Sequence, residues 1–103
     1  MKTYEYRVCL KGKSAHGSRP DLGDNTILCF SEFMELFPYF STLACAKIIS
    51  VTSGSSSNII PDSLEFLCRV EVRETSEADV FCERFQSLLE HTARMHSCSV
   101  QFL

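Results

Sequence analysis

The order of two hydrophobic patterns constrains the fold of this chain more than any other feature. Apolar and charged residues alternate along 4–11 and again along 64–73, which is typical of strands with one buried face. Each stretch is followed, directly or after a loop, by apolar residues that recur every three or four positions, as on one face of a helix. The same strand-then-helix order therefore occurs twice in 103 residues.

In the first half, residues 11–23 collect glycines, serines and a proline, and they predict a long irregular loop. Asp24 is the predicted N-cap of the helix that follows. Pro38 is expected to end that helix near Phe37, because proline lacks a backbone N–H and its ring clashes with the preceding turn. The predicted buried face of this helix is Ile27, Phe30, Met34 and Phe37.

In the second half, residues 43–52 are rich in isoleucine and valine and predict a strand, and 53–57 predict the tip of a hairpin loop. Ser76, with Asp79 three residues later, resembles a capping box at the start of the second helix. Residues 97–103 predict a short last strand. The predicted inner face of the strand at 64–73 is Phe66, Cys68, Val70 and Val72, and that of the helix is Ala78, Phe81, Cys82, Phe85, Leu88, Leu89 and Thr92.

This order is β-α-β-β-α-β, which predicts an α+β, ferredoxin-like fold with a four-stranded antiparallel sheet and two helices on one face. In that topology the first and last strands are neighbours, so the two ends of the chain are expected close together, as in a domain inserted within another domain. The length predicts a single domain over residues 1–103. This fold hosts many functions, so the site residues must identify the function.

Charge and cysteine content exclude several classes of protein. Ten basic and thirteen acidic residues give a net charge of −3, which argues against nucleic-acid binding. No apolar run approaches the ~20 residues that span a bilayer, and the first residues do not resemble a signal peptide. The six cysteines include no C-x-x-C pair, so we expect reduced thiols in the core or at its margin, and not a zinc site. We therefore expect a cytoplasmic protein that binds neither nucleic acid nor membranes.

The three histidines differ in what they could do. His91 and His96 are five residues apart, about 140° around a helix, so they are not expected to share a metal ion and are interpreted as surface or boundary residues at a helix end. His16 lies in the loop at 11–23, and loops of that length are usually functional or mobile. A solvent-facing histidine can donate a hydrogen bond to a polarised carbonyl, although His16 taken alone is also compatible with an ordinary surface residue.

Two motifs together resemble a known family. The first is GKSAHGSRPDLGDN at 12–25, and the second is SNIIPD at 57–62, followed by a strand that ends in VEVR and by an amphipathic helix. Both resemble the dimerisation (lid) domain of zinc-dependent aminoacylase/carboxypeptidase-type metallopeptidases and amidohydrolases, a family that includes hippurate hydrolase and succinyl-diaminopimelate desuccinylase. The resemblance covers essentially the whole chain.

The resemblance implies roles for three residues. In the family, the lid histidine reaches across a dimer interface and helps to polarise the scissile carbonyl in the partner's active site. His16 matches that position, with a role in oxyanion stabilisation and not in metal ligation. The family's lid asparagine matches Asn58, and the lid arginine that binds the substrate carboxylate matches Arg73.

Each assignment has a plainer alternative. The spacing from Asn58 to Arg73 is slightly longer than the family pattern, and Arg69 lies on the same predicted strand face as Arg73 and is a rival for its role. Both arginines are also compatible with solvated residues that pair with Glu65 and Glu71. Asn58 is compatible with a turn residue before Pro61.

The metal ligands of the family are not found in this sequence, so we expect no catalysis from the chain alone and no metal bound to it. Zinc or another divalent metal is expected in the catalytic domain of a parent hydrolase that cleaves an amide bond near a carboxylate. The chain is expected to be the excised lid of that parent and to form a homodimer through an edge strand at 43–52 and the first helix. A second buried surface is also expected, formed by the aromatic residues Phe30, Phe33, Phe37, Tyr39 and Phe40, and the alternative is that they simply make a bulky core. The alternative function is a free-standing ferredoxin-like regulatory module that binds a small ligand.

Overall fold

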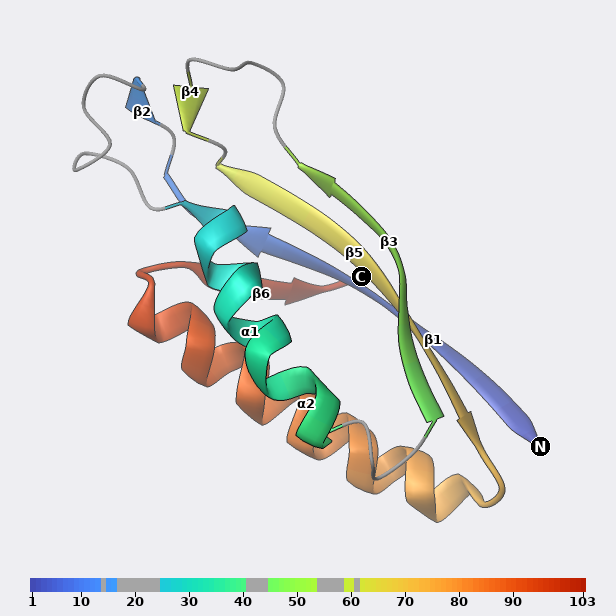
Figure 1. Ribbon diagram of the computed structural model, residues 1–103. Helices are drawn as coiled ribbons and strands as arrows, with labels where there is room; N and C mark the ends of the chain where they lie inside the picture. The colour runs from blue at the N-terminus through green and yellow to red at the C-terminus, as the bar shows by residue number, and fades with distance from the viewer. Residues whose placement is uncertain (14, 17–24, 41–44, 54–58, 61) are drawn as a thin grey trace.

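A computed structural model describes residues 1–13, 15–16, 25–40, 45–53, 59–60 and 62–103. Four strands form an antiparallel sheet in the order β3-β5-β1-β6: β3 (Cys45–Ser53), β5 (Ser63–Val72), β1 (Lys2–Lys11) and β6 (Ser99–Phe102). The helices α1 (Thr26–Phe40) and α2 (Thr75–Met95) cover one face of this sheet (Figure 1). The predicted α+β ferredoxin-like fold is confirmed. Two further strands, β2 (Ala15–His16) and β4 (Ile59–Ile60), pair with each other beyond one end of the sheet.

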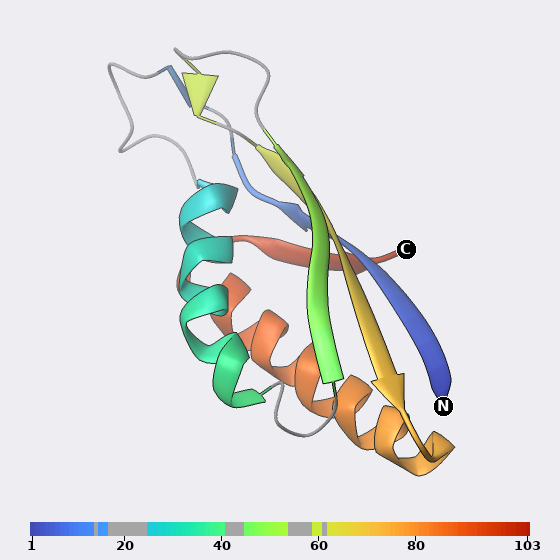
Figure 2. The same cartoon turned by 45° about the vertical axis from the view of Figure 1, so that its right-hand side comes forward.

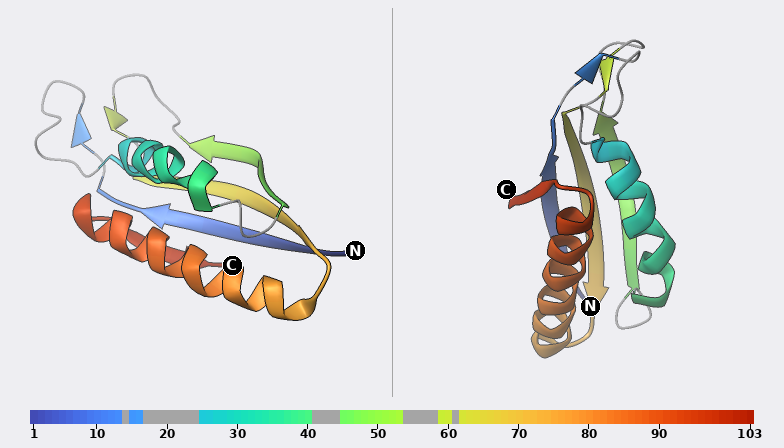
Figure 3. Two further views of the ribbon diagram at one scale, coloured as in Figure 1. Left: turned by 60° about the horizontal axis from the view of Figure 1, so that its bottom comes forward. Right: turned by 90° about the vertical axis from the view of Figure 1, so that its left-hand side faces the viewer.

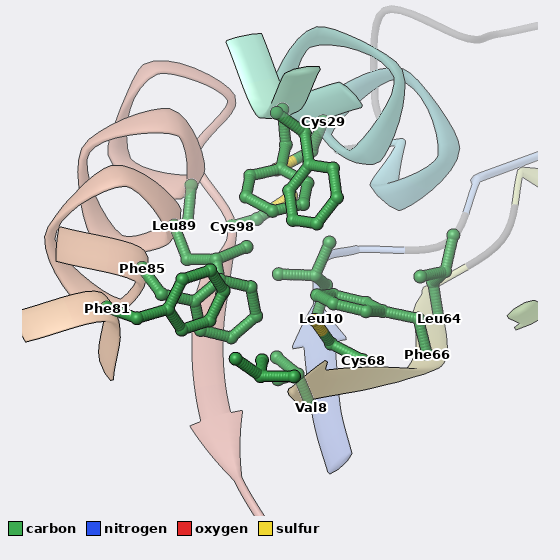
Figure 4. Packing of buried hydrophobic residues seen from close by; sticks show 14 of the residues in the cluster. Val8, Leu10, Cys29, Leu64, Phe66, Cys68, Phe81, Phe85, Leu89 and Cys98 are labelled. Atoms are coloured by element: carbon green, nitrogen blue, oxygen red, sulfur yellow. The ribbon is translucent and has the colours of Figure 1, made fainter. Parts of the chain in front are cut away.

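The core lies between the sheet and the two helices, where alternate residues of the strands meet the apolar stripe of each helix (Figure 4). Phe33 of α1, Phe66 of β5 and Phe85 of α2 contact one another, with ring centroids 5.7 to 6.2 Å apart. Aromatic pairs at such distances add to the stabilisation that burial provides. One side chain from the sheet and one from each helix therefore meet at the centre of the fold.

The first helix differs from its prediction at both ends. It begins at Thr26, and Asn25 caps it, because the Asn25 Oδ1 accepts a hydrogen bond from the N–H of Ile27 at 2.9 Å. The expectation that Asp24 is the N-cap was therefore wrong, and Asp24 itself lies outside the described residues. The helix also continues past Pro38 to Phe40. Proline removes only its own hydrogen bond, and in the last turn of a helix few bonds remain to be lost.

The buried face of α1 agrees with the prediction at Phe37, which is buried, and in part at Phe30 and Met34, which pack half-buried against the core, but not at Ile27. Thr26 and Cys29 are buried, followed at helical spacing by Phe33 and Phe37, whereas Ile27 is 44% exposed. A shift of one residue rotates a side chain by about 100° around the helix, which turns Ile27 towards solvent. Phe33 and Phe37 are core residues and Phe30 packs half-buried against the core, so these three do not form the predicted second surface. The side chains of Tyr39 and Phe40 lie outside those that the structure describes. The exposed apolar residues of α1 are instead Ile27, Leu28 and Leu36.

The second helix begins one residue before the predicted capping box. Glu74 is its N-cap and makes no side-chain capping hydrogen bond, and Ser76 lies inside the first turn. The predicted inner face is otherwise present, with Cys82 and Leu88 half-buried at its margins. At the other end, His96 contacts Glu32 of α1, so the end of α2 is linked to the first helix.

The six cysteines are free thiols, four of them buried and Cys82 half-buried. Cys45 is exposed at the start of β3, so the expectation that every cysteine lies in or beside the core was wrong for this residue. A strand at the edge of a sheet has fewer neighbours to cover its first residues.

The last strand runs antiparallel to β1, as predicted, and the N–H of Leu103 donates to the carbonyl of Arg7 at 2.8 Å. Because β1 begins at Lys2, its first residues extend beyond the C-terminal end of the chain (Figure 1). In the described part of the chain, no helix has the length and apolar character needed to cross a membrane.

Candidate functional site

The long pairing of β1 with β5 separates the candidate site residues into two groups. The two strands pair from Lys2 with Val72 at one end to Lys11 with Ser63 at the other. We call these ends of the sheet the arginine end, where Arg73 follows β5, and the histidine end, where β1 leads to His16. The strand β5 has ten residues, and a rise of about 3.3 Å per residue places the two ends of the sheet about 33 Å apart.

At the histidine end, the pairing of the two strands continues past the main sheet. The N–H of Gly12 donates to the carbonyl of Asp62 at 2.8 Å, and β2 then pairs with β4, with His16 opposite Ile59. The two family-like motifs, which are far apart in the sequence, are thus held against each other by backbone pairing. Asn58 lies outside the described residues, and in the sequence it directly precedes Ile59.

At the arginine end, Arg73 is exposed and lines a shallow hollow of about 190 Å³. Ligand pockets are usually about 300–1,000 Å³, so this hollow is small for a complete binding site. The carboxylate side chains of Glu71 and Glu77 also line it, together with Met1, Cys45 and Val72. An anionic ligand there would lie next to one basic and two acidic residues, which limits what this end can bind without a further partner.

Arg69 lies in the middle of β5, and its neighbours Cys68 and Val70 are buried beneath the helices. Because side chains alternate along a strand, Arg69 projects from the opposite, helix-free face. Its Nη2 lies 3.8 Å from an oxygen of Glu5, which is also its cross-strand partner in β1. The alternative that Arg69 pairs with Glu65 or Glu71 was therefore wrong, since its partner is Glu5.

The sequence did not reveal which acidic residue would pair with Arg69, because the choice depends on strand register. Glu5 follows the same alternating pattern as Glu65 and Glu71, and only the pairing of β1 with β5 puts it opposite Arg69. The contact between His96 and Glu32 was missed for a similar reason, because it joins two helices that are distant in the sequence.

The described residues contain no group of three histidine, cysteine, aspartate or glutamate side chains that could hold a metal ion. His91 is exposed on α2, and His96 contacts Glu32. The described part of the chain therefore offers hydrogen-bonding and charged groups, and no metal centre of its own.

In a comparison with protein families, residues 3–96 match the family described as the peptidase dimerisation domain. No curated protein matches the chain closely enough to be called a relative.

Several solved structures share the fold. A tripeptidase from Staphylococcus aureus superposes with a TM-score of 0.85 at 17% identity, over 98% of this chain and 28% of the tripeptidase. An aminobenzoyl-glutamate utilization protein from Klebsiella pneumoniae superposes with a TM-score of 0.80 at 17% identity, over 97% of this chain and 27% of the other protein. An amidase of the hydantoinase/carbamoylase family from Burkholderia multivorans superposes with a TM-score of 0.85 at 14% identity, over 98% of this chain and 26% of the amidase. The chain thus spans little more than a quarter of the length of these proteins.

Proposed function

The chain belongs to the peptidase dimerisation domain family, and on this basis we propose that it is the lid and dimerisation domain of a metal-dependent peptidase or amidohydrolase. The parent enzyme cleaves an amide bond near a free carboxylate, and its catalytic domain holds zinc or another divalent metal. The observation that carries this proposal is the pairing of His16 with Ile59, which holds both family-like motifs at one end of the sheet.

His16 is the proposed catalytic residue of this domain. An imidazole N–H can donate a hydrogen bond to the oxygen that becomes negatively charged when an amide carbonyl is attacked. The proposed role of Asn58 is to bind substrate next to His16. Support comes from the sequence order, in which Asn58 directly precedes the strand that pairs with His16.

Arg73 is proposed to bind the substrate carboxylate through its planar guanidinium. It is preferred to Arg69, whose guanidinium already faces the carboxylate of Glu5. The ends of the sheet lie about 33 Å apart, so His16 and Arg73 of one chain cannot contact the same small substrate. In a two-fold dimer, His16 therefore acts on the active site of the partner, while Arg73 acts on the site of its own chain.

The dimer is proposed to form along β3 and α1. The strand β3 is an edge of the sheet and contains no proline, so its backbone can pair with a second copy. Figure 2 shows β3 in front of β5, and the right-hand view of Figure 3 shows α1 and β3 on one lateral side of the domain, with α2 and β6 on the other. That side exposes Leu28 of α1 by 59% and Val51 of β3 by 46%. Apolar surface of this kind favours burial in an interface.

The free thiols and the lack of a membrane-spanning helix among the described residues agree with the proposed cytoplasmic location. The alternative of a free-standing ligand-binding module has less support, because the hollow beside Arg73 is small and lined by two carboxylates.

Subunit complementation in the full-length enzyme tests this arrangement. His16→Ala and Arg73→Ala each inactivate the homodimer, and the two variants are then mixed, unfolded and refolded together. In each mixed dimer, one active site receives an intact Arg73 from its own chain and an intact His16 from the partner. Random assortment then restores about a quarter of the wild-type activity.

The control is a chain that carries both substitutions and is refolded with each single variant in turn. Neither mixture can assemble a site that has both an intact His16 and an intact Arg73, so neither should regain activity. If the mixed single variants stay as inactive as their parents, His16 and Arg73 do not act on one substrate from different subunits.

A further inference from the structure

Two buried cysteines from distant parts of the chain meet beneath α1. Cys29, in α1, lies beside Cys98, just before β6, and Cys98 contributes to raising the pKa of the Cys29 thiol. The Cys98 thiol lies 3.5 Å from the carbonyl oxygen of His96, to which it donates. Cys29 and Cys98 are exposed by only 1% and 9%, and both are reduced thiols. Figure 4 shows the two side chains next to each other at one side of the core.

The two neighbouring side chains come from α1 and from the residue before β6, so a covalent link between them would join two elements that are distant in the sequence. Such a link requires the two sulfur atoms to reach an S–S distance of about 2.05 Å. Such a link would close a loop that contains most of the chain, from residue 29 to residue 98, and the entropic effect of a disulfide grows with loop length. It would also connect α1 to the last strand.

We propose that Cys29 and Cys98 form a reversible disulfide when the chain meets a disulfide oxidant such as oxidised glutathione. This inference concerns the stability of the domain and does not depend on the proposed catalytic role of the parent enzyme.

The last strand provides the route by which an oxidant reaches the pair. β6 is an edge strand held to β1 by four residue pairs, and the residue before Cys98, Ser97, has a φ of 56°. That left-handed backbone conformation favours glycine and is unfavourable for serine. A short edge strand with such a junction is expected to open before the rest of the sheet, which would expose both thiols.

We call the domain closed while β6 is paired with β1. The pKa of the Cys29 thiol in the closed domain also favours reaction only after β6 has opened. Burial raises the pKa of the Cys29 thiol to about 12, with further contributions from Cys98 and Glu32. A thiol with this pKa stays protonated at neutral pH, and the thiolate is the nucleophile in disulfide exchange. Cys29 is therefore a poor nucleophile while it is buried, and opening of β6 makes it more reactive.

The exchange proceeds in two balanced steps. The Cys98 thiolate, its proton released to water, attacks one sulfur of oxidised glutathione, whose S–S bond breaks and releases one glutathione thiolate. The Cys29 thiolate, formed when Cys29 also gives its proton to water, attacks the Cys98 sulfur of this mixed disulfide and releases the second glutathione. Two protein thiols lose two electrons, and the oxidised glutathione gains them.

The test uses the full chain carrying Cys45→Ser, which removes the exposed thiol and prevents links between chains. The chain is incubated with oxidised glutathione, with and without urea below the unfolding midpoint, and the remaining thiols are alkylated. Peptide mapping should find residues 29 and 98 joined, with the loss of two hydrogen atoms, and a reducing agent should reverse the link. The melting temperature of the oxidised chain should rise by roughly 10 °C or more.

Two matched variants in the same background check the assignment. Cys98→Ser should abolish the oxidant-dependent rise in melting temperature, whereas Cys82→Ser, which removes a half-buried thiol elsewhere, should keep it. If Cys29 and Cys98 both remain open to alkylation after oxidation in urea, or if either joins another cysteine instead, the proposal is wrong. That result would leave the proposed dimer and its complementation test unaffected.

Discussion

His16 lies opposite Ile59 in the antiparallel pairing of β2 with β4. This backbone pairing joins the segment after the first strand to the segment before β5, and it forms a second, two-stranded sheet beyond one end of the four-stranded sheet. The histidine is thereby held on a short ladder at the end of the domain, about 33 Å from the end that carries Arg73. The separation gives each end of the sheet a different role in the predictions below.

Replacing His16 by alanine in the full-length enzyme is expected to lower kcat by roughly 10²–10³, as for the loss of one oxyanion donor. The effect should fall mainly on kcat and less on KM, because the hydrogen bond strengthens as charge develops on the carbonyl oxygen. The matched control is His91→Ala, since His91 is exposed on α2 and far from the β2–β4 ladder in the sequence. Near-normal turnover of the His16 variant would remove this residue from the reaction.

Comparing Arg73→Ala with Arg69→Ala distinguishes the two candidate carboxylate-binding arginines. Loss of Arg73 should lower kcat/KM roughly 10- to 100-fold for a substrate with a free carboxylate, as expected for a lost hydrogen bond to a charged group. Loss of Arg69 should have a small effect, because its guanidinium already faces Glu5 and both groups are about half exposed. Steady-state kinetics with the substrate and its carboxamide analogue measure the difference. The opposite ranking would transfer the role to Arg69.

A charge on the outer face of α1 should weaken association of the chain. Leu28→Asp places a carboxylate within the proposed interface, where it would be buried without a partner. Val80→Asp makes the same kind of change on α2, at a position exposed by 45%, and serves as the control. Sedimentation equilibrium should show the Leu28 variant largely monomeric at concentrations where the wild type and the Val80 variant are dimers. Equal dimerisation of all three would place the interface elsewhere.

The stability of the domain should decrease at high pH. Burial, followed by interaction with Cys82, raises the pKa of Tyr6 from 10.0 to about 12. The unfolded chain therefore loses this proton first, so the contribution of Tyr6 is fully present below pH 10 and is lost as the pH rises through 12. Burial also raises the pKa of the Cys68 thiol from 9.0 to about 12, so the decline in stability begins near pH 9.

Urea unfolding measured between pH 8 and 12 checks this expectation. Tyr6→Phe should flatten the part of the decline above pH 10, because the ring remains and the titrating hydroxyl is gone. Tyr4→Phe, on the same face of β1, is the matched control. An unchanged pH dependence in the Tyr6 variant would mean that its hydroxyl titrates alike in the folded and unfolded chains.

The sequence predicted the repeated strand–helix order and most of the core because both depend on local periodicity. Alternation along β5 placed Phe66, Cys68 and Val70 on the inner face, and each is buried. The errors lie at element ends and helix faces. Asn25 caps α1 in place of Asp24, and the buried stripe of that helix misses Ile27. A shift of one residue changes a cap or rotates a face without altering the apolar pattern that predicts the helix.

The sequence by itself determined the fold class and the residues that match the family motifs, since composition, spacing and motif order are properties of the chain alone. Only the tertiary structure decided which of these residues share an end of the sheet. His16 and Ile59 are brought together by strand pairing, and the same antiparallel pairing carries Arg73 to the far end. It also decided that Arg69 faces Glu5 and that Cys29 meets Cys98. Strand register and helix packing set these contacts between distant residues, and no local pattern in the sequence specifies either.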